Sequence, residues 1–163
     1  MTKTNAEIRA QGEHHVITEL RRRGIKHRLE PRARRIDIVI PSGRGNLTVQ
    51  VRVTSLGQRN GWLLTEEHER AMDDRLMYAF VDTEPAVPET FFIPGAVVGD
   101  VLRTSHRAWL ATPGRGGRPH RDNPMRMIRS DYRFLVQGYP AEWLEKYRER
   151  WELLETRSTI SDR

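Results

Sequence analysis

The sequence predicts a single α/β domain in which helices flank a mixed central sheet of about four to five strands. Three observations predict it. Residues 5–23 have a capped amphipathic helical pattern, residues 36–40 and 47–53 alternate apolar with polar side chains, and further strand patterns precede a second helical pattern. A chain of 163 residues is also long enough to build one core.

The first helix is expected over residues 5–23. Thr4 and Glu7 have the spacing of a capping box, in which each side chain binds the backbone N–H of the other residue. Gly24 follows the last turn, where glycine commonly ends a helix in the left-handed conformation. The apolar stripe of this helix consists of Ile8, Val16, Ile17 and Leu20.

A short strand at 25–30 and a basic connection at 31–35 lead into two strands, 36–40 and 47–53, joined by a turn at 41–46. An antiparallel register that aligns Ile40 with Leu47 brings all the apolar residues onto one face, because side chains alternate along a strand. The other apolar pairs in this register are Ile38 with Val49 and Ile36 with Val51.

The same register determines the polar face of the hairpin. It places Asp37 opposite Gln50, with Arg52 one pleat further along. Aspartate is disfavoured in strands and costly to bury, so a functional role for Asp37 is the favoured interpretation. Gln50 and Arg52 have a second interpretation, as the solvated face of an amphipathic hairpin.

Downstream, strands are expected at 76–81 and 90–93, and a helix from Pro94 through about residue 102. A glycine- and arginine-rich loop covers 112–124, and a last helix is expected at 140–156. The apolar stripe of that helix, which either packs in the core or forms a homodimer contact, consists of Leu144, Tyr147, Trp151 and Leu154. The domain is thus assigned to residues 1–156, with a flexible tail at 157–163.

Composition points to a polyanionic partner. The formal net charge is +6, and three of the 28 basic residues are Lys, so the other 25 are Arg. Arginine makes bidentate contacts with phosphate and guanine, although a GC-rich genome also replaces Lys with Arg throughout a protein.

Cysteine is absent, which excludes disulfides and thiolate sites. No apolar run is long enough to cross a membrane and no secretory signal is visible, so a cytoplasmic protein is expected.

Four features in order resemble the PD-(D/E)XK, or restriction-endonuclease-like, nucleases. They are Gly12-Glu13 in the first helix, Gly24 after it, Asp37 in an Ile-Asp-Ile-Val-Ile strand, and the segment Val49-Gln50-Val51-Arg52-Val53-Thr54-Ser55. The resemblance covers residues 5–82, and it is to bacterial members with Gln-x-Lys in the second strand. It implies a restriction-endonuclease-like core that hydrolyses phosphodiester bonds in DNA, or less favourably RNA, with Mg²⁺ or Mn²⁺.

The resemblance also implies residue roles. Asp37 and Gln50 are the expected metal ligands, because Mg²⁺ prefers oxygen ligands. Glu13 is an auxiliary ligand or positions water, since it lies beside the apolar stripe on the helix face turned toward the sheet; a residue that merely flanks the stripe is the alternative. Arg52 occupies the position of the family's lysine and is expected on the phosphate. Arginine there is larger and planar, and Gln50 replaces a carboxylate, so the site is electrostatically altered.

Further nucleic-acid contacts are expected from Arg44 in the hairpin turn and from three arginines of the 112–124 loop, Arg115, Arg118 and Arg121. A merely solvated loop is the other interpretation. The sequence therefore favours a metal-dependent nuclease. Its alternative is a catalytically degenerate protein of the same fold that acts as a nucleic-acid-binding or protein-interaction module.

Overall fold

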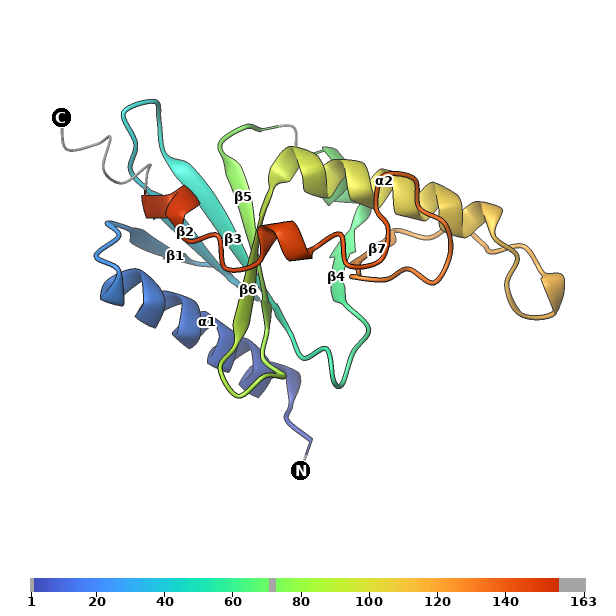
Figure 1. Cartoon of the computed structure of the whole chain (residues 1–163), viewed down its shortest axis with the longest axis horizontal. Helices are drawn as coiled ribbons and strands as arrows, with labels where there is room; N and C mark the ends of the chain where they lie inside the picture. Colours follow the sequence, from blue (N-terminus) through green and yellow to red (C-terminus); the bar gives the residue numbers. More distant parts are fainter. Residues whose placement is uncertain (1, 71–72, 156–163) are drawn as a thin grey trace.

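The computed structural model describes residues 2–70 and 73–155 (Figure 1). Its main sheet has the strand order β1-β2-β3-β5-β6 and consists of β1 (Arg28–Pro31), β2 (Ile36–Ile40), β3 (Leu47–Thr54), β5 (Leu76–Asp82) and β6 (Glu89–Pro94). Neighbouring strands are antiparallel except β3 and β5, which are parallel. The predicted α/β class with a mixed sheet is confirmed.

The helix α1 (Asn5–Arg22) covers one face of the main sheet. Both halves of the predicted capping box are present, and Gly24 follows with a φ of 65°. Gly12 lies against β3 so closely that a Cβ there would be 2.3 Å from a methyl group of Val53. Small size at position 12 therefore determines how closely α1 approaches the sheet.

The hairpin of β2 and β3 has the predicted register. Asp37 pairs with Gln50, Ile38 with Val49, and Ile40 with Leu47. The apolar residues of this register pack under α1, where Ile38, Ile40, Leu47 and Val49 are all buried. Asp37, Gln50 and Arg52 consequently belong to the opposite face of the sheet, because side chains alternate.

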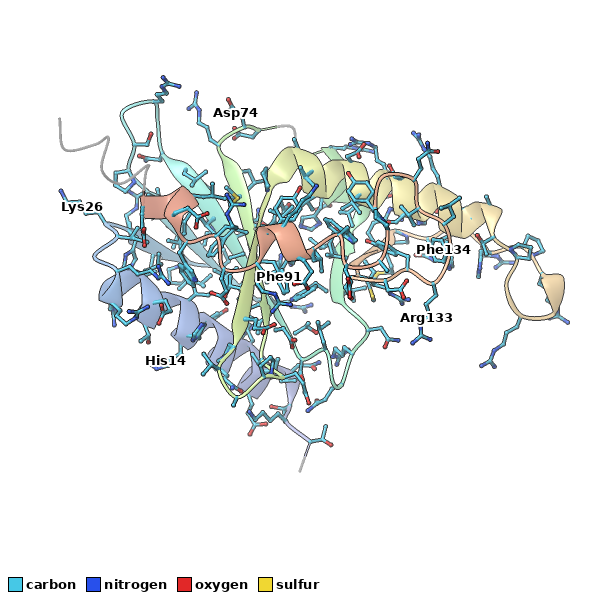
Figure 2. All side chains as sticks on the ribbon, in the orientation of Figure 1. His14, Lys26, Asp74, Phe91, Arg133 and Phe134 are labelled. Carbon is cyan, nitrogen blue, oxygen red and sulfur yellow. The ribbon has the colours of Figure 1, made fainter. Side chains whose placement is uncertain are left out.

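That opposite face is covered by a second layer, of which only the helix after Pro94 is predicted from the sequence. The layer contains a small antiparallel sheet of β4 (Trp62–Thr65) and β7 (Met125–Ile128), together with α2 (Gly95–Ala111) and the short 3₁₀ helix η1 (Glu66–Arg70). Its apolar side chains pack on Tyr78, Phe80, Phe91 and Ile93 of the main sheet. Figure 2 shows the side chains that fill the spaces between the layers.

Two expected boundaries are shifted. The first edge strand begins at Arg28 rather than residue 25, because Ile25 instead packs in the core and its N–H binds the carbonyl of Leu20 3.0 Å away. The second helix continues to Ala111 rather than ending near 102, and it contacts η1 and β7 as well as the main sheet.

The expected helix at 140–156 is wrong. Residues 145–147 form a 3₁₀ helix, η3 (Glu145–Tyr147), after which Glu149 has a φ of 53° and a helical turn resumes only at 152. The cause is packing: Trp143 and Leu144 belong to the core under α2, whereas Trp151 and Leu154 belong to the core under α1. One straight helix cannot reach both.

The apolar stripe of that segment is mostly interior. Leu144, Trp151 and Leu154 are buried within the chain, so core packing accounts for them and they form no surface for a homodimer. The predicted tail 157–163 lies outside the described residues. Within the described ranges, neither helix is long and apolar enough to cross a membrane.

Candidate functional site

A row of polar groups crosses three strands on the second face of the main sheet. Asp37 of β2 pairs with Gln50 of β3, and Gln50 pairs with Tyr78 of β5. Arg52 follows two residues after Gln50 on the same face, opposite Phe80. The predicted neighbours Asp37, Gln50 and Arg52 are therefore brought together.

Asp37 is buried, and two arginines hold its carboxylate. The Nε of Arg35 donates to Oδ1 at 2.8 Å, and the Nε of Arg32 donates to Oδ2 at 3.1 Å. Both arginines come from the connection between β1 and β2, which is closed by a hydrogen bond from Arg32 N–H to the carbonyl of Arg35. Each carboxylate oxygen thus already has a cationic partner.

Arg52 bridges the sheet and η1. Its Nη2 donates to Nε2 of His68 at 2.7 Å and lies 3.4 Å from the amide oxygen of Gln50. Because Nε2 of His68 accepts from a guanidinium, the ring proton belongs on Nδ1, where the carbonyl of Thr65 lies at 3.2 Å. Burial, followed by the charge of Arg52, lowers the pKa of His68, so the neutral ring is favoured.

The same burial acts on Arg52 itself and on Tyr78. Desolvation, together with the nearby charge of Arg35, lowers the pKa of Arg52, and desolvation raises the pKa of Tyr78. The Nε of Arg52 and the hydroxyl of Tyr78 are buried and have no hydrogen-bond partner among the described residues. Unsatisfied buried donors of this kind are rare and often occur at functional sites.

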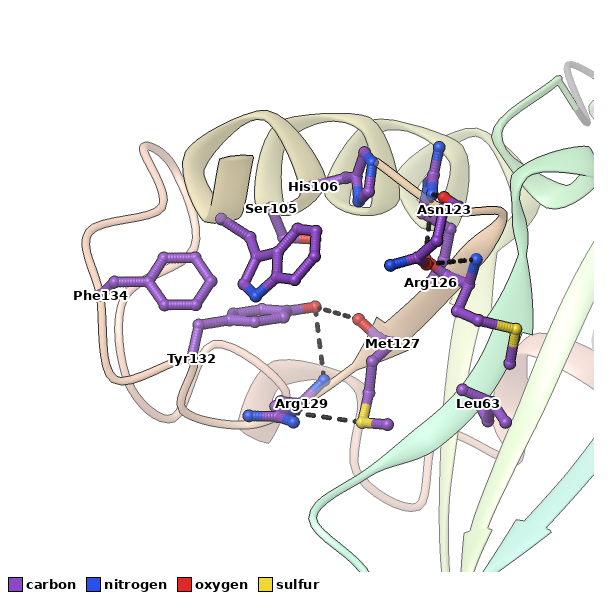
Figure 3. Close-up of a pocket in the computed structure, with 11 residues that line it drawn as sticks. Leu63, Ser105, His106, Asn123, Arg126, Met127, Arg129, Tyr132 and Phe134 are labelled. Atoms are coloured by element: carbon purple, nitrogen blue, oxygen red, sulfur yellow. Dashed lines mark hydrogen bonds between the residues drawn. The ribbon is translucent and has the colours of Figure 1, made fainter. Parts of the chain in front are cut away.

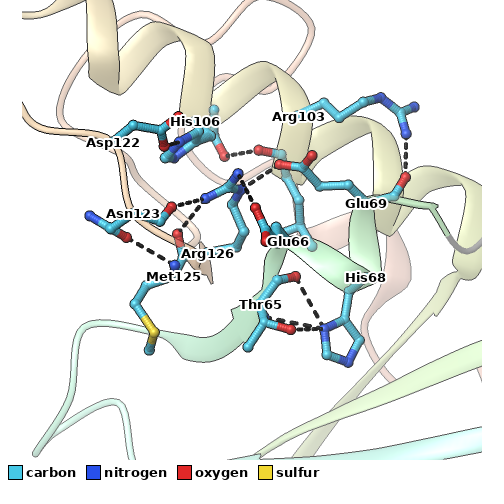
Figure 4. A network of polar contacts seen from close by, with 12 residues as sticks. Thr65, Glu66, His68, Glu69, Arg103, His106, Asp122, Asn123, Met125 and Arg126 are labelled. Atoms are coloured by element: carbon cyan, nitrogen blue, oxygen red, sulfur yellow. Dashed lines mark hydrogen bonds and ion pairs between the residues drawn. The ribbon is translucent and has the colours of Figure 1, made fainter.

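A network behind η1 fixes the position of His68 (Figure 4). Arg126 of β7 forms an ion pair with Glu69 and donates to the carbonyls of Asn123 and Met125 at 2.7 and 2.9 Å. Arg103 of α2 donates to the carbonyl of Glu69. Contacts from two elements therefore hold η1 over the sheet.

A cleft of about 570 Å³ lies beside this site, at the end of β3. Its walls come from the start of α1, the β1–β2 connection, residues 51–54, the segment 59–63, and β7 with the residues after it. Six arginines line it, and none of the described residues in its walls is acidic. They are Arg9, Arg34, Arg35, Arg52, Arg59 and Arg129.

Most of this positive charge has no anionic partner. Arg35 pairs with Asp37, and Arg9 lies 3.9 Å from Glu13. The other four arginines form no ion pair with a carboxylate of the described residues. Because a cleft lined by one sign of charge concentrates its field, the space suits an anion.

A divalent cation does not fit the residues as they are arranged. Each oxygen of Asp37 already accepts from a guanidinium, whose positive charge would lie close to a bound cation, and Gln50 contributes only a neutral oxygen. Within residues 2–70 and 73–155, no group of three or more His, Asp or Glu side chains is placed to hold a metal ion. The arginine side chains around Asp37 make the local charge positive, which disfavours binding of a divalent cation.

The remaining predicted residues lie apart from this cluster. Glu13 is half-buried on α1, over the other face of the sheet, where burial raises its pKa. Neither Arg44 nor any of the three loop arginines, Arg115, Arg118 and Arg121, lines the cleft. All four are exposed, and the loop lies at the far end of α2 (Figure 1).

Sequence reasoning missed several members of the site. Arg32 and Arg35 belong to the segment recognised only as a basic connection, and their spacing from Asp37 is the signal that was present. His68 and Arg129 are brought in by the second layer, and nothing local in the sequence marks them. No family model, curated protein or solved structure matches this chain.

Proposed function

We propose that this protein binds nucleic acid, with the phosphate backbone held in the arginine cleft beside Asp37. The observation that carries the proposal is the cleft itself, with six arginines and no acidic side chain in its described walls. We further propose that its core is a restriction-endonuclease-like one in which the PD-(D/E)XK site binds rather than cleaves. The hairpin register of Asp37 and Gln50 supports that assignment.

Guanidinium groups recognise phosphate through two parallel N–H donors, and each neutralised phosphate releases condensed counterions. Four cleft arginines lack a carboxylate partner in the described chain, so they have donors to offer without first breaking an ion pair. A protein-interaction module is the alternative, because arginine is also enriched at interfaces between proteins. A cleft lined by charge of one sign favours the polyanion.

The direct test removes charge from the cleft. Arg34 and Arg59 are exposed members of its wall, and the double variant Arg34→Gln/Arg59→Gln should weaken DNA binding at low salt by about tenfold. The slope of log K against log salt should fall by about 2, because two phosphate contacts are lost.

The matched control is Arg21→Gln/Arg107→Gln, which loses the same charge from exposed positions outside the cleft. Salt titrations followed by fluorescence anisotropy measure both variants. Equal losses of DNA affinity in the two variants would show that only the net charge of the protein matters, and this result would overturn the proposal.

Metal-dependent cleavage is the second candidate function, favoured by Asp37, Gln50 and Arg52 on one face of the hairpin. Mg²⁺ or Mn²⁺ would supply an activated water and neutralise charge on the phosphate. The arginine partners of Asp37 oppose this candidate, since they occupy both carboxylate oxygens.

Asp37→Asn separates the two functions. If the site binds phosphate, loss of the buried negative charge should raise DNA affinity several-fold, because Arg32 and Arg35 become available. If the site cleaves, Mn²⁺-dependent cleavage should disappear while binding persists. Asp74→Asn makes the same charge change at an exposed position and is the control. We expect higher affinity and no wild-type cleavage; cleavage abolished by Asp37→Asn would establish the nuclease instead.

The altered family positions give an independent test. Gln50→Glu together with Arg52→Lys restores the carboxylate and lysine of the resembled family. Cleavage gained by that double variant, from an inactive wild type, would support a degenerate nuclease. If the double variant gains no cleavage activity, the resemblance to the nuclease family no longer supports the proposal, and the arginine cleft is the remaining support for nucleic-acid binding.

A further inference from the structure

A second, smaller pocket of about 210 Å³ lies between α2 and β7 (Figure 3). Its walls are largely aromatic and apolar, in contrast to the arginine cleft. Trp109, Tyr132 and Phe134 supply three rings, and Leu63 and Met127 add apolar side chains. The pocket is too small and too apolar for a phosphate backbone, but a flat ring suits it.

The pocket and the cleft share a wall. Leu63, Met127 and Arg129 line both spaces. Leu63 and Met127 are direct partners in the β4–β7 register, and Leu63 is 52% exposed although it is a large apolar residue. One side of this small sheet therefore separates a cationic space from an aromatic one.

The rings are held in place within the chain. The hydroxyl of Tyr132 donates to the carbonyl of Met127 at 2.9 Å. Trp109 stacks on His106 and on His120, with centroid separations of 5.5 and 4.1 Å. Since these contacts fix the walls in advance, a ligand would lose little affinity to ordering them.

We infer that this pocket receives one unpaired base of a single-stranded nucleic acid whose phosphates lie in the arginine cleft. The inference rests on the proposed function and names its substrate class. Arg129 stands at the shared wall, and its side chain has no carboxylate partner in the described chain, so it can bind the phosphate between the two spaces.

A single strand with an unpaired base is the ligand that fits both the pocket and the cleft. Proteins that bind single strands combine a cationic groove for the backbone with aromatic side chains for the bases. A duplex keeps its bases stacked and paired, so it can fill the cleft without reaching the pocket. A free apolar ligand would use the pocket but would gain nothing from six arginines.

The experiment compares three ligands of about 16 nucleotides at low salt: a single strand, its duplex, and an abasic strand with the same phosphates. Affinities for a DNA strand and for an RNA strand of the same sequence show which of the two nucleic acids supplies the base. The protein variants are Phe134→Ala, which removes a ring of the pocket, and Leu135→Ala. Leu135 is the matched control, because it is 89% exposed and does not line the pocket.

The single strand should bind wild type about tenfold more tightly than the abasic strand, and Phe134→Ala should remove that advantage while Leu135→Ala keeps it. Thermal melting checks that both variants are folded. Trp109 provides a second signal, because the other three tryptophans, Trp62, Trp143 and Trp151, are buried. Base-containing strands should quench its fluorescence, and abasic strands should not.

The outcomes separate the two proposals. Equal affinity for abasic, single-stranded and duplex ligands, with no quenching, would overturn the base pocket and leave the arginine cleft standing. An advantage for the single strand that survives Phe134→Ala in a folded variant would also overturn it. Failure of every strand to bind would overturn the cleft and the pocket together.

Discussion

Arg52 shows what a single side chain changes at this site. Its guanidinium donates to His68 while lying beside Gln50, a double contact that the point charge of a lysine cannot reproduce with the same planar geometry. The sequence identified the residue and its departure from the resembled family. It did not identify His68, because a partner 16 residues away is placed by the second layer and by no local pattern.

We expect His68 to make the stability of the fold depend on pH. Burial and the charge of Arg52 lower its pKa in the folded chain below the value of about 6.5 expected in the unfolded chain. Its contribution to stability is therefore complete above that unfolded value and is lost as pH falls toward the folded pKa. Between about pH 7 and pH 5 the melting temperature of wild type should fall more steeply than that of His68→Gln.

Melting curves at several pH values measure this difference. His14→Gln, at an exposed position of α1, is the control and should keep the wild-type pH dependence. Parallel curves for wild type and His68→Gln would show that His68 does not couple protonation to folding.

At the scale of elements, the contact between α1 and β3 depends on Gly12. A Cβ at that position would lie 2.3 Å from a methyl group of Val53. Gly12→Ala should destabilise the fold by about 1 kcal/mol or more, because overpacking costs about 1–3 kcal/mol and outweighs the helix propensity of alanine.

Val53→Ala provides the compensating change. The double variant should recover part of the stability that Gly12→Ala loses, which denaturant titrations of the two single variants and the double variant measure as a favourable coupling. If the changes in unfolding free energy of the two single variants simply add in the double variant, α1 moves away from β3 without cost and the contact does not limit their approach.

Elements were predictable where one local pattern had one structural solution. The hairpin was correct because a one-residue slip would turn Ile38 and Ile40 to the polar side. The helix at 140–156 failed because helical spacing of Leu144 and Trp151 does not show that the two pack in separate cores. The strands β4 and β7 have only four residues each, too few for a period to appear.

At the scale of the whole molecule, two groups of arginines are candidates for contact with nucleic acid, the cleft and the loop that contains Arg115 and Arg118. The loop joins the pocket side of the molecule, because His120 stacks on Trp109. The sequence showed the loop arginines, which are adjacent in the chain. It could not show the cleft, whose arginines converge from five separate segments.

The loop should matter only for long ligands. Replacing Arg115, Arg118 and Arg121 together with Gln should flatten the salt dependence for a single strand of about 40 nucleotides, by up to about 2 in slope. A strand that just fills the cleft and pocket should be unaffected. Salt titrations with both lengths measure this, and unchanged slopes for the long strand would exclude the loop from the interface.

The path of residues 145–150 has a consequence for the behaviour of the protein in concentrated solution. Arg148 forms an antiparallel bridge with Phe91, and Glu149 exchanges hydrogen bonds with Thr90, so this segment occupies the outer edge of β6. The opposite edge strand, β1, has four residues and ends in a proline, which has no N–H to donate.

An uncovered strand edge recruits another chain by extending the sheet. Glu149→Gly removes the carboxylate that binds the Thr90 N–H and keeps the buried side chains of the segment, so this variant should self-associate with rising concentration more than the wild type does. Light scattering after size exclusion measures the difference, and an equally monodisperse variant would show that this contact does not protect β6. If the variant does self-associate, residues 148–149 keep the edge of β6 from pairing with a second chain, a contribution to solubility that involves no ligand.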